Sequence, residues 1–376
     1  MTYRPPITRH APGKLFVAGE YAVVRPGTPA VLVAVDREVT ATVSDPGTDP
    51  DGAEVTVISD LCPVTTRLRH GASGLTGRGA DDEQRARISL AHVVSALDVV
   101  CALLVERGLP KPALSVAVSS GLHDNGRKYG LGSSGAVTVA TIASVTDHCG
   151  LSLTAEEWFR LALLATARLD PKASGGDLAA STWGGWIAYQ APDRIAVLEL
   201  ADERGVEAML RAPWPGFAVR RLPPPQGLAL EVGWTGEPVS TEVKVKRLDT
   251  DEPGRETAYR EFLVRSTTHV RDLVGALERA DDREVLHRIA CVRRNLAQLD
   301  TQAQLGIFTD QLIALCHAAE AVGGAGKPSG AGGGDCGIAF VDAAARSDIA
   351  QMRERWTAAG VMPLDVRPAD RKERMQ

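Results

Sequence analysis

The chain has 376 residues, of which 44% are apolar and 24% charged, and its formal net charge is -5. This length exceeds what one hydrophobic core usually holds, so two domains are expected, and the composition is that of an ordinary globular protein. The slight negative charge excludes a broad basic surface for DNA or RNA, and we expect no nucleic-acid partner. Any anionic ligand must be held by local groups.

The cysteines and the N-terminus indicate a cellular compartment. No two cysteines form a Cys-x-x-Cys pair, which argues against a zinc site or a disulfide framework, and we expect all of them to be reduced. The first ten residues lack an apolar signal core, and no window approaches the roughly 20 apolar residues of a membrane span. We therefore expect a cytoplasmic protein that does not contact a membrane.

The N-terminal elements are predicted mainly from apolar periodicity. Residues 7–43 alternate apolar and polar positions around turns, which indicates strands of a hairpin-rich sheet. Residues 44–84 are rich in Asp, Gly, Pro and Thr and predict an irregular edge with one short strand at 55–58. Apolar residues at three- and four-residue spacing predict a single helix over 85–107, followed by a strand over 113–119.

The middle of the chain continues with two helices. Small and β-branched residues at 135–149 predict the first, and Thr154 with Glu157 forms a capping box that opens a second helix to about Arg168. Prolines then cluster at 213–227, which is the best candidate for a linker.

The C-terminal part is predicted to contain a strand at 228–233, a glycine loop and further elements. These are helices at about 255–279, 282–299 and 309–321 and a strand at 337–341. Strands and helices interleave in both halves, so we expect an α+β fold with domains at 1–225 and 226–376.

The run Gly-Leu-Gly-Ser-Ser-Gly at 130–135 is the strongest local signal. It matches the dinucleotide-binding pattern, so a Rossmann oxidoreductase is one interpretation. However, about ten polar residues separate it from the preceding strand, and Asp147 comes near the end of the following helix. A glycine turn without a ligand is the other alternative. We favour nucleotide phosphates at a helix N-terminus, bound by Lys128, Gly130, Leu131, Gly132, Ser133, Ser134 and Gly135.

Three further segments carry residues suited to phosphate chemistry. The first, at 11–21, contains Lys14 and Glu20, although a strand lysine is usually solvated. The second, at 170–177, ends in Asp177, which could simply cap a helix. The third, at 327–335, has more glycines than turning requires, and close approach to an anion explains them better.

Taken together in this order, the four segments resemble the GHMP kinases, the superfamily of galacto-, homoserine, mevalonate and phosphomevalonate kinases. The resemblance is closest to the phosphomevalonate kinases, through Gly-Glu-Tyr at 19–21, the run at 128–135 and Gly-Trp-Thr-Gly-Glu-Pro-Val-Ser-Thr at 233–241. The charged run at 242–246 departs from the pattern. The resemblance implies two domains, an N-terminal one like ribosomal protein S5 domain 2 and a ferredoxin-like C-terminal one.

The resemblance also implies an activity and its residues. ATP would transfer its γ-phosphoryl group to the 5-phosphate of 5-phosphomevalonate, with Lys14 and Asp177 as the catalytic pair and Ser134 as a Mg²⁺ ligand. Glu20 would orient the site or partner Lys14, and a monomer or homodimer is expected. The residues expected to contact the acceptor are Lys14, Tyr21, Ser174, Ser240, Ser329, Gly330 and Ala331.

Asp177 needs little basicity in such a reaction. The acceptor phosphate has a second pKa of about 6 and is largely ionised near neutral pH. We therefore expect Asp177 to position Lys14 and the substrate's hydroxyl group or the metal, while Lys14 offsets charge on the γ-phosphoryl group. The alternatives are mevalonate kinase, diphosphomevalonate decarboxylase, another GHMP kinase, or a catalytically silent ligand sensor.

Overall fold

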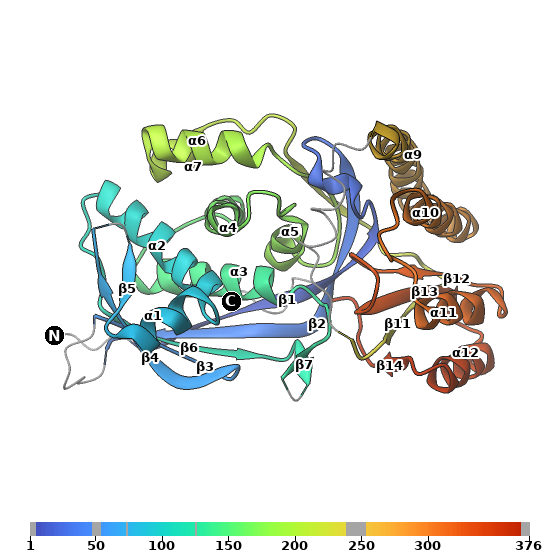
Figure 1. The fold of residues 1–376 in the computed structure, drawn as a ribbon, viewed down its shortest axis with the longest axis horizontal. Coiled ribbons are helices and arrows are strands. Elements are labelled where there is room, and N and C mark those ends of the chain that lie inside the picture. Colours follow the sequence, from blue (N-terminus) through green and yellow to red (C-terminus); the bar gives the residue numbers. More distant parts are fainter. Residues whose placement is uncertain (1–4, 47–53, 73, 125, 238–252, 370–376) are drawn as a thin grey trace.

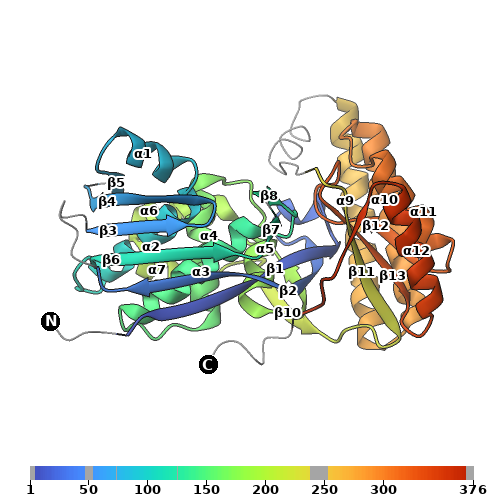
Figure 2. The same ribbon diagram turned by 90° about the horizontal axis from the view of Figure 1, so that it is seen from below.

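The computed structural model describes residues 5–46, 54–72, 74–124, 126–237 and 253–369, and its strands form two main sheets (Figures 1 and 2). The first is an eight-stranded sheet in the order β10-β9-β2-β6-β3-β4-β5, with β1 paired to β2. Its strands are β1 (Ile7–Ala18), β2 (Pro29–Ser44), β3 (Val55–Ser59), β4 (Cys62–His70), β5 (Leu75–Gly77), β6 (Leu114–Ser120), β9 (Trp186–Gln190) and β10 (Ala218–Leu222).

The hairpin predicted from residues 7–43 is confirmed as β1 and β2. The two strands pair antiparallel, with Lys14 opposite Ala34, and β2 continues into pairing with β6 and β9. Residues 30–35 of β2 are buried. A long, valine-rich strand with neighbours along its whole length forms the centre of the sheet, and this fixes β1 and Lys14 beside it.

The edge at 44–84 is more regular than predicted. It contains β3, β4 and β5, so the expectation of a single short strand is wrong. Strand β3 runs parallel to β6 and antiparallel to β4. The buried positions of β4 are filled by Cys62, Thr66 and Leu68. Because a cysteine and a threonine occupy two of these positions, and not large apolar residues, the sequence of β4 shows only a weak alternation of apolar and polar residues.

The single helix predicted over 85–107 is also wrong. The segment forms α1 (Ala80–Arg87) and α2 (Ala91–Glu106), bent by 90° at the break between them. Ile88, which fitted the helical period, lies in this break and is 71% exposed. Among the described residues no single helix is long and apolar enough to cross a membrane, although this bent pair passes the same test on length and composition.

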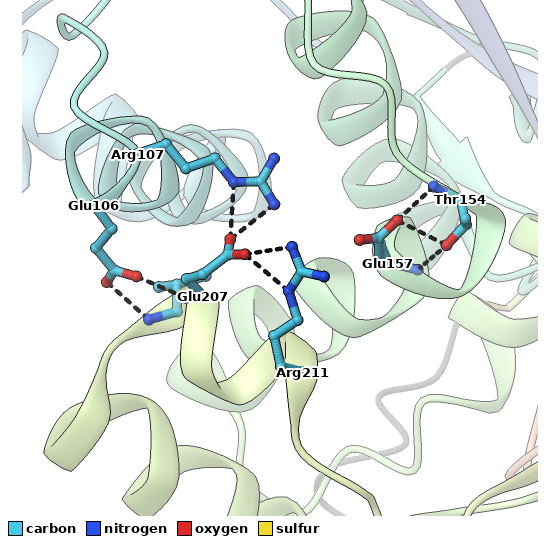
Figure 3. Close-up of polar contacts among 7 residues, drawn as sticks. Glu106, Arg107, Thr154, Glu157, Glu207 and Arg211 are labelled. Atoms are coloured by element: carbon cyan, nitrogen blue, oxygen red, sulfur yellow. Dashed lines mark hydrogen bonds and ion pairs between the residues drawn. The ribbon is translucent and has the colours of Figure 1, made fainter.

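Helices cover one face of the first sheet (Figure 1). They are α2, α3 (Ser133–His148), α4 (Ala155–Leu169) and α5 (Gly176–Trp183), with α6 (Arg194–Arg204) and α7 (Val206–Arg211) beyond α4. The capping box of α4 is confirmed: the Thr154 backbone N–H donates to Glu157 Oε2 (2.7 Å), and the Glu157 N–H donates to Thr154 Oγ1 (3.2 Å; Figure 3). Helix α3 packs directly on β1 and β2.

The second sheet has the order β12-β13-β11-β14, with antiparallel neighbours. Its strands are β11 (Leu228–Trp234), β12 (Ala325–Pro328), β13 (Cys336–Asp342) and β14 (Met362–Leu364). Its helices are α9 (Pro253–Glu278), α10 (Asp282–Ala303), α11 (Asp310–Glu320) and α12 (Arg346–Ala358). This strand order, with helices between the first two strands and before the last, is the expected ferredoxin-like arrangement.

The proposed boundary at 225/226 falls between β10, which belongs to the first sheet, and β11, which belongs to the second. The proline-rich stretch 213–227 is therefore not all linker, because it includes β10. The chain also returns to the first sheet near its end, where the Ala369 N–H donates to the Ala34 carbonyl (2.9 Å) and the Gly185 N–H donates to the Ala369 carbonyl (2.7 Å).

Candidate active site

The glycine loop 130–135 lies between β8 (Arg127–Lys128), which pairs with β7 (His123–Asp124), and the start of α3. Gly130 and Gly132 both have left-handed backbones, with φ of +79° and +78°, and Gly132 is the N-cap of α3. Ser133 and Ser134 occupy the first turn, where backbone N–H groups have no partner within the helix. Lys128, at the end of β8, is exposed. The free backbone N–H groups at this helix N-terminus can hold an anion.

The side chains of Lys14 and Asp177 converge on this loop. A Cβ at Gly132 would lie 3.0 Å from Lys14 Cε and 3.4 Å from Asp177 Cβ, and one at Gly135 would lie 2.6 Å from the carboxyl carbon of Asp177. The Lys14 backbone N–H donates to the Leu131 carbonyl (2.8 Å). Gly132 and Gly135 are thus glycines because the two predicted catalytic side chains approach the loop backbone.

Lys14 and Asp177 lie close to the same loop without forming an ion pair in the described part of the chain. Lys14 Nζ donates to the Gly130 carbonyl (3.4 Å), and Asp177 Oδ1 accepts from the Leu178 N–H (3.0 Å). Helix α5 has Gly175 as its N-cap and no side-chain cap. Asp177 is therefore not the N-cap of α5. Its side chain is half-buried and lies against the loop 130–135.

Glu20 does not partner Lys14. Its Oε1 accepts an ion-paired hydrogen bond from Lys327 Nζ, and the side chains of Glu20 and Lys327 are 2% and 0% exposed. The expectation of a Glu20–Lys14 pair is corrected by this contact, which joins residues 307 positions apart in the chain. Lys327 was given no role from the sequence, although it stands at the start of the second glycine segment.

The second glycine loop is only partly explained by an anion. A Cβ at Gly332 would lie 2.5 Å from the Ile307 carbonyl oxygen, and the Gly333 N–H donates to that oxygen (2.7 Å). Packing against Ile307 therefore requires a glycine at 332. Gly330, with φ of +86° and no atom within 4 Å of a built Cβ, is the position that fits close approach of a ligand.

The two glycine loops contact each other through Asp335. Its side chain lies against Gly130, where a Cβ would come within 2.5 Å of the Asp335 carboxyl carbon, and its backbone is left-handed at φ of +52°. The Asp335 carbonyl accepts from the Thr235 N–H (3.0 Å). Sequence reasoning did not assign Asp335 to the site, because nothing local in the sequence reveals that the loops meet.

The predicted acceptor residues near the second loop are hydrogen-bonded to the first sheet. Ser329 Oγ accepts from the Phe16 N–H (2.9 Å) and donates to the Phe16 carbonyl (3.0 Å). The Tyr21 hydroxyl donates to the Ala331 carbonyl. Burial, with Asp300 and Glu20 nearby, raises the pKa of Tyr21, which keeps its hydroxyl a neutral donor.

Of the remaining predicted residues, Ser174 lies within the described part of the chain and Ser240 does not. Ser174 lies just before α5, and its Oγ accepts from the Gly176 N–H (3.2 Å) while its carbonyl accepts from the Tyr189 hydroxyl (2.7 Å). Ser240 and the charged run 242–246 lie outside the described residues.

His92, in the first turn of α2, is a further residue of this region that sequence reasoning missed. Its Nδ1 lies 3.5 Å from Thr138 Oγ1, which donates to the Ser134 carbonyl (2.9 Å). Burial lowers the pKa of His92, and of the two nearby charges Asp177 raises it while Lys128 lowers it. The charges of Asp177 and Lys128 therefore both influence the pKa of His92.

Comparison with known proteins identifies the family of the chain. The models of the GHMP kinases N-terminal domain and C-terminal domain match residues 91–185 and 268–358. The chain is 60% identical to the phosphomevalonate kinase of Streptomyces sp. (strain CL190), over 96% of this chain and 97% of that enzyme. It is 27% identical to the mevalonate kinase of Methanothermobacter thermautotrophicus, over 93% and 94% of the two chains.

A solved structure extends the similarity to the whole fold. The phosphomevalonate kinase of Streptococcus pneumoniae, in complex with phosphomevalonate and AMPPNP, superposes with a TM-score of 0.82 at 25% identity, covering 96% of this chain and all of that one. The Rossmann interpretation is excluded by these matches and by the largely antiparallel sheet. The chain belongs to the GHMP kinase superfamily and, within it, to the phosphomevalonate kinases.

Proposed function

We propose that this protein transfers the γ-phosphoryl group of ATP to the 5-phosphate of (R)-5-phosphomevalonate, giving 5-diphosphomevalonate and ADP in the mevalonate pathway of isoprenoid biosynthesis. The observation that supports this most is the convergence of Lys14 and Asp177 on an anion-binding loop at the start of α3, in a chain 60% identical to a curated phosphomevalonate kinase.

The loop and Lys14 supply the charge stabilisation that phosphoryl transfer needs. An ionised oxygen of the acceptor phosphate forms a bond to the γ-phosphorus, and the bond from that phosphorus to the β,γ-bridging oxygen breaks, leaving its electron pair on ADP. Lys14 offsets charge on the transferred group, and the N–H groups of Ser133 and Ser134 hold ATP phosphates. No proton has to be removed from an ionised acceptor, so Asp177 acts by positioning.

The residues present fit a magnesium ion. The Asp177 carboxyl lies against Gly135, and the residue before this glycine, Ser134, carries a hydroxyl group in the first turn of α3. Mg²⁺ commonly takes one or two such protein oxygens, with substrate phosphates and water completing its shell. Ser134 and Asp177 would hold the ion, which would neutralise phosphate charge.

The acceptor is proposed to contact Tyr21, Ser174, Ser329, Gly330 and Ala331, with Ser240 as a further contact. The Tyr21 hydroxyl is hydrogen-bonded to the Ala331 carbonyl, and no atom lies within 4 Å of a Cβ built on Gly330. The protein is proposed to work in the cytoplasm. In support, its six cysteines are far apart in the sequence and form no Cys-x-x-Cys pair, a pattern that gives no sign of a disulfide framework.

A coupled assay of ADP release with three acceptors tests the proposal. Mevalonate, 5-phosphomevalonate and 5-diphosphomevalonate are supplied separately with ATP and Mg²⁺. We expect turnover with 5-phosphomevalonate alone. Turnover with mevalonate alone would assign the protein to the mevalonate kinases, and no turnover with any acceptor would favour the ligand-sensor alternative.

A further inference from the structure

A group of contacts ties residues 16–21, which follow Lys14 on the first sheet, to residues 327–331, which open the second glycine loop. We call these contacts the inter-sheet bracket. They comprise the Glu20–Lys327 ion pair, both Phe16–Ser329 hydrogen bonds and the Tyr21–Ala331 hydrogen bond. The Tyr259 hydroxyl of α9 adds a bond to the Tyr21 carbonyl (2.9 Å).

Lys327 is the centre of the bracket. Its side chain is fully buried, and its Nζ donates to Glu20 Oε1, to the Pro328 carbonyl (2.7 Å) and to the Phe16 carbonyl (3.5 Å). These three acceptors match the three protons of an ammonium group. The ammonium group is thus fully used within the protein, and it holds one end of β1 against one end of β12.

Glu20 is less completely satisfied. Its side chain is 2% exposed, and in the described part of the chain its Oε2 has no hydrogen-bond partner. A carboxylate buried in this way is costly, and replacing a buried ion pair by apolar residues is often neutral or stabilising. Maximal stability therefore does not explain why a Glu–Lys pair stands here. In some proteins, however, a buried polar group is retained because it fixes the relative position of two segments.

We propose that Glu20 and Lys327 are positioning residues for the phosphate acceptor: their ion pair sets the spacing between Tyr21 and the Ser329–Ala331 segment. Each residue of the pair is adjacent to a predicted acceptor contact or within two residues of one. Neither is itself a catalytic residue. This inference rests on the proposed function, because it takes the acceptor contacts from there.

The Glu20–Lys327 ion pair does not include a residue of the loop 130–135, although Lys14 Nζ lies over the ring of Phe16, 5.3 Å from its centroid. Lys14, Asp177 and Asp335 have side chains that approach the loop 130–135, whereas the side chains of Glu20 and Lys327 bond to each other and to the carbonyls of Phe16 and Pro328. Loss of the pair should therefore change acceptor binding much more than ATP binding.

Steady-state kinetics of Glu20→Gln, Lys327→Met and the double variant test the proposal, with KM measured for each substrate. Because a displacement of about 1 Å can cost about 100-fold, we expect each single variant to raise KM for 5-phosphomevalonate by at least about tenfold. KM for ATP should change by less than about twofold, and the double variant should be no worse than the poorer single one, since the two residues act as a unit.

A matched control is the pair of Glu231 on β11 and Arg353 on α12, which lies within the second domain (Nε to Oε2, 2.6 Å). Glu231→Gln should leave both KM values unchanged. Tyr21→Phe serves as a second probe that buries no unpaired charge, and we expect it to raise the acceptor KM in the same direction by a smaller factor.

Three results would overturn the inference: equal rises in both KM values, additive effects in the double variant, or a loss of thermal stability with both KM values unchanged. If Glu20→Gln or Lys327→Met does not fold, an unchanged acceptor KM in Tyr21→Phe would overturn it. Failure of the proposed function is distinguishable, because the wild-type protein would then not use 5-phosphomevalonate at all.

Discussion

Charged residues are used differently in two regions of this protein. At the surface, Glu207 on α7 pairs with both Arg107, at the end of α2, and Arg211, while Glu106 accepts from the N–H groups of Val206 and Glu207 (Figure 3). At the junction of the two sheets, Glu20 and Lys327 form an ion pair with almost no exposed surface.

The difference shows that the number of ionic contacts says little about their importance. Side chains in the surface network, such as Glu207 at 31% exposed and Arg107 at 24%, are screened by water and salt. The buried pair is poorly screened, so removing one partner leaves a charge that nothing neutralises. The surface network therefore adds modest stability, and the buried pair controls geometry.

The largest expected effect concerns the two charged side chains, Lys14 and Asp177, beside the loop 130–135. Lys14→Met should lower kcat by about a thousandfold or more, because it removes a cation that offsets charge in the transition state. Asp177→Asn should be less severe, since the ionised acceptor needs no base. The kcat values of both variants, measured at saturating concentrations of both substrates, test this. If Asp177→Asn has a kcat several orders of magnitude below that of Lys14→Met, the positioning role of Asp177 is contradicted.

Breaking the buried ion pair should have the largest effect on stability. Lys327→Met is expected to lower the free energy of unfolding by about 3 to 5 kcal/mol, because Glu20 is left charged and unpaired inside the protein. Urea unfolding of the two single variants and the double variant measures it. A double variant that is more stable than either single one would confirm the unpaired charge as the cause, and equal losses in all three would contradict it.

His92 gives a pH-dependent test of the buried region. Its pKa is lowered in the folded protein, so the unfolded chain binds more protons below the ordinary histidine pKa of about 6.5. The contribution of His92 to the free energy of unfolding should therefore be constant above that pH. It should fall as the pH drops through that value, by at most about 1.4 kcal/mol per pH unit.

Unfolding midpoints between pH 5 and 8 for wild type and His92→Gln check this prediction. The variant should show a shallower decline on acidification. His269, whose pKa burial also lowers, adds a second contribution that persists in the variant. Parallel curves for the two proteins would show that His92 is not responsible.

The smallest effect is expected in the surface network. Arg107→Gln removes one partner of Glu207 and should cost about 0.2 to 1 kcal/mol, with less effect at high salt because exposed pairs are screened. Urea unfolding at low and high ionic strength measures it, with activity as the control. If Arg107→Gln lowered the free energy of unfolding as much as Lys327→Met does, the surface network and the buried pair would not differ in their contribution to stability.

The sequence was most informative where function and structure depend on neighbouring residues. The capping box of Thr154 and Glu157 was predicted because both partners lie within one helical turn. The loop 130–135 was placed correctly at the start of α3 because glycines and serines carry their backbone preferences with them. The ferredoxin-like arrangement and the family followed from four motifs in order, not from periodicity.

Predictions failed where a local pattern was ambiguous. Ile88 fitted a helical period yet lies at a 90° bend, and β4 was missed because Thr66 and Cys62 fill buried positions that larger apolar residues usually mark. In both cases packing against the rest of the sheet overrode a weak local preference.

The sequence alone therefore determined the position of the loop 130–135 at the start of α3, because glycines and serines carry their own backbone preferences, and it predicted Lys14 and Asp177 as site residues. Only the tertiary structure decided the partners of the remaining charges. Glu20 pairs with Lys327 and not with Lys14, and Asp335 meets Gly130, because the second sheet packs against the end of β1. Contacts between residues about 200 to 300 positions apart depend on chain topology, which no local spacing encodes.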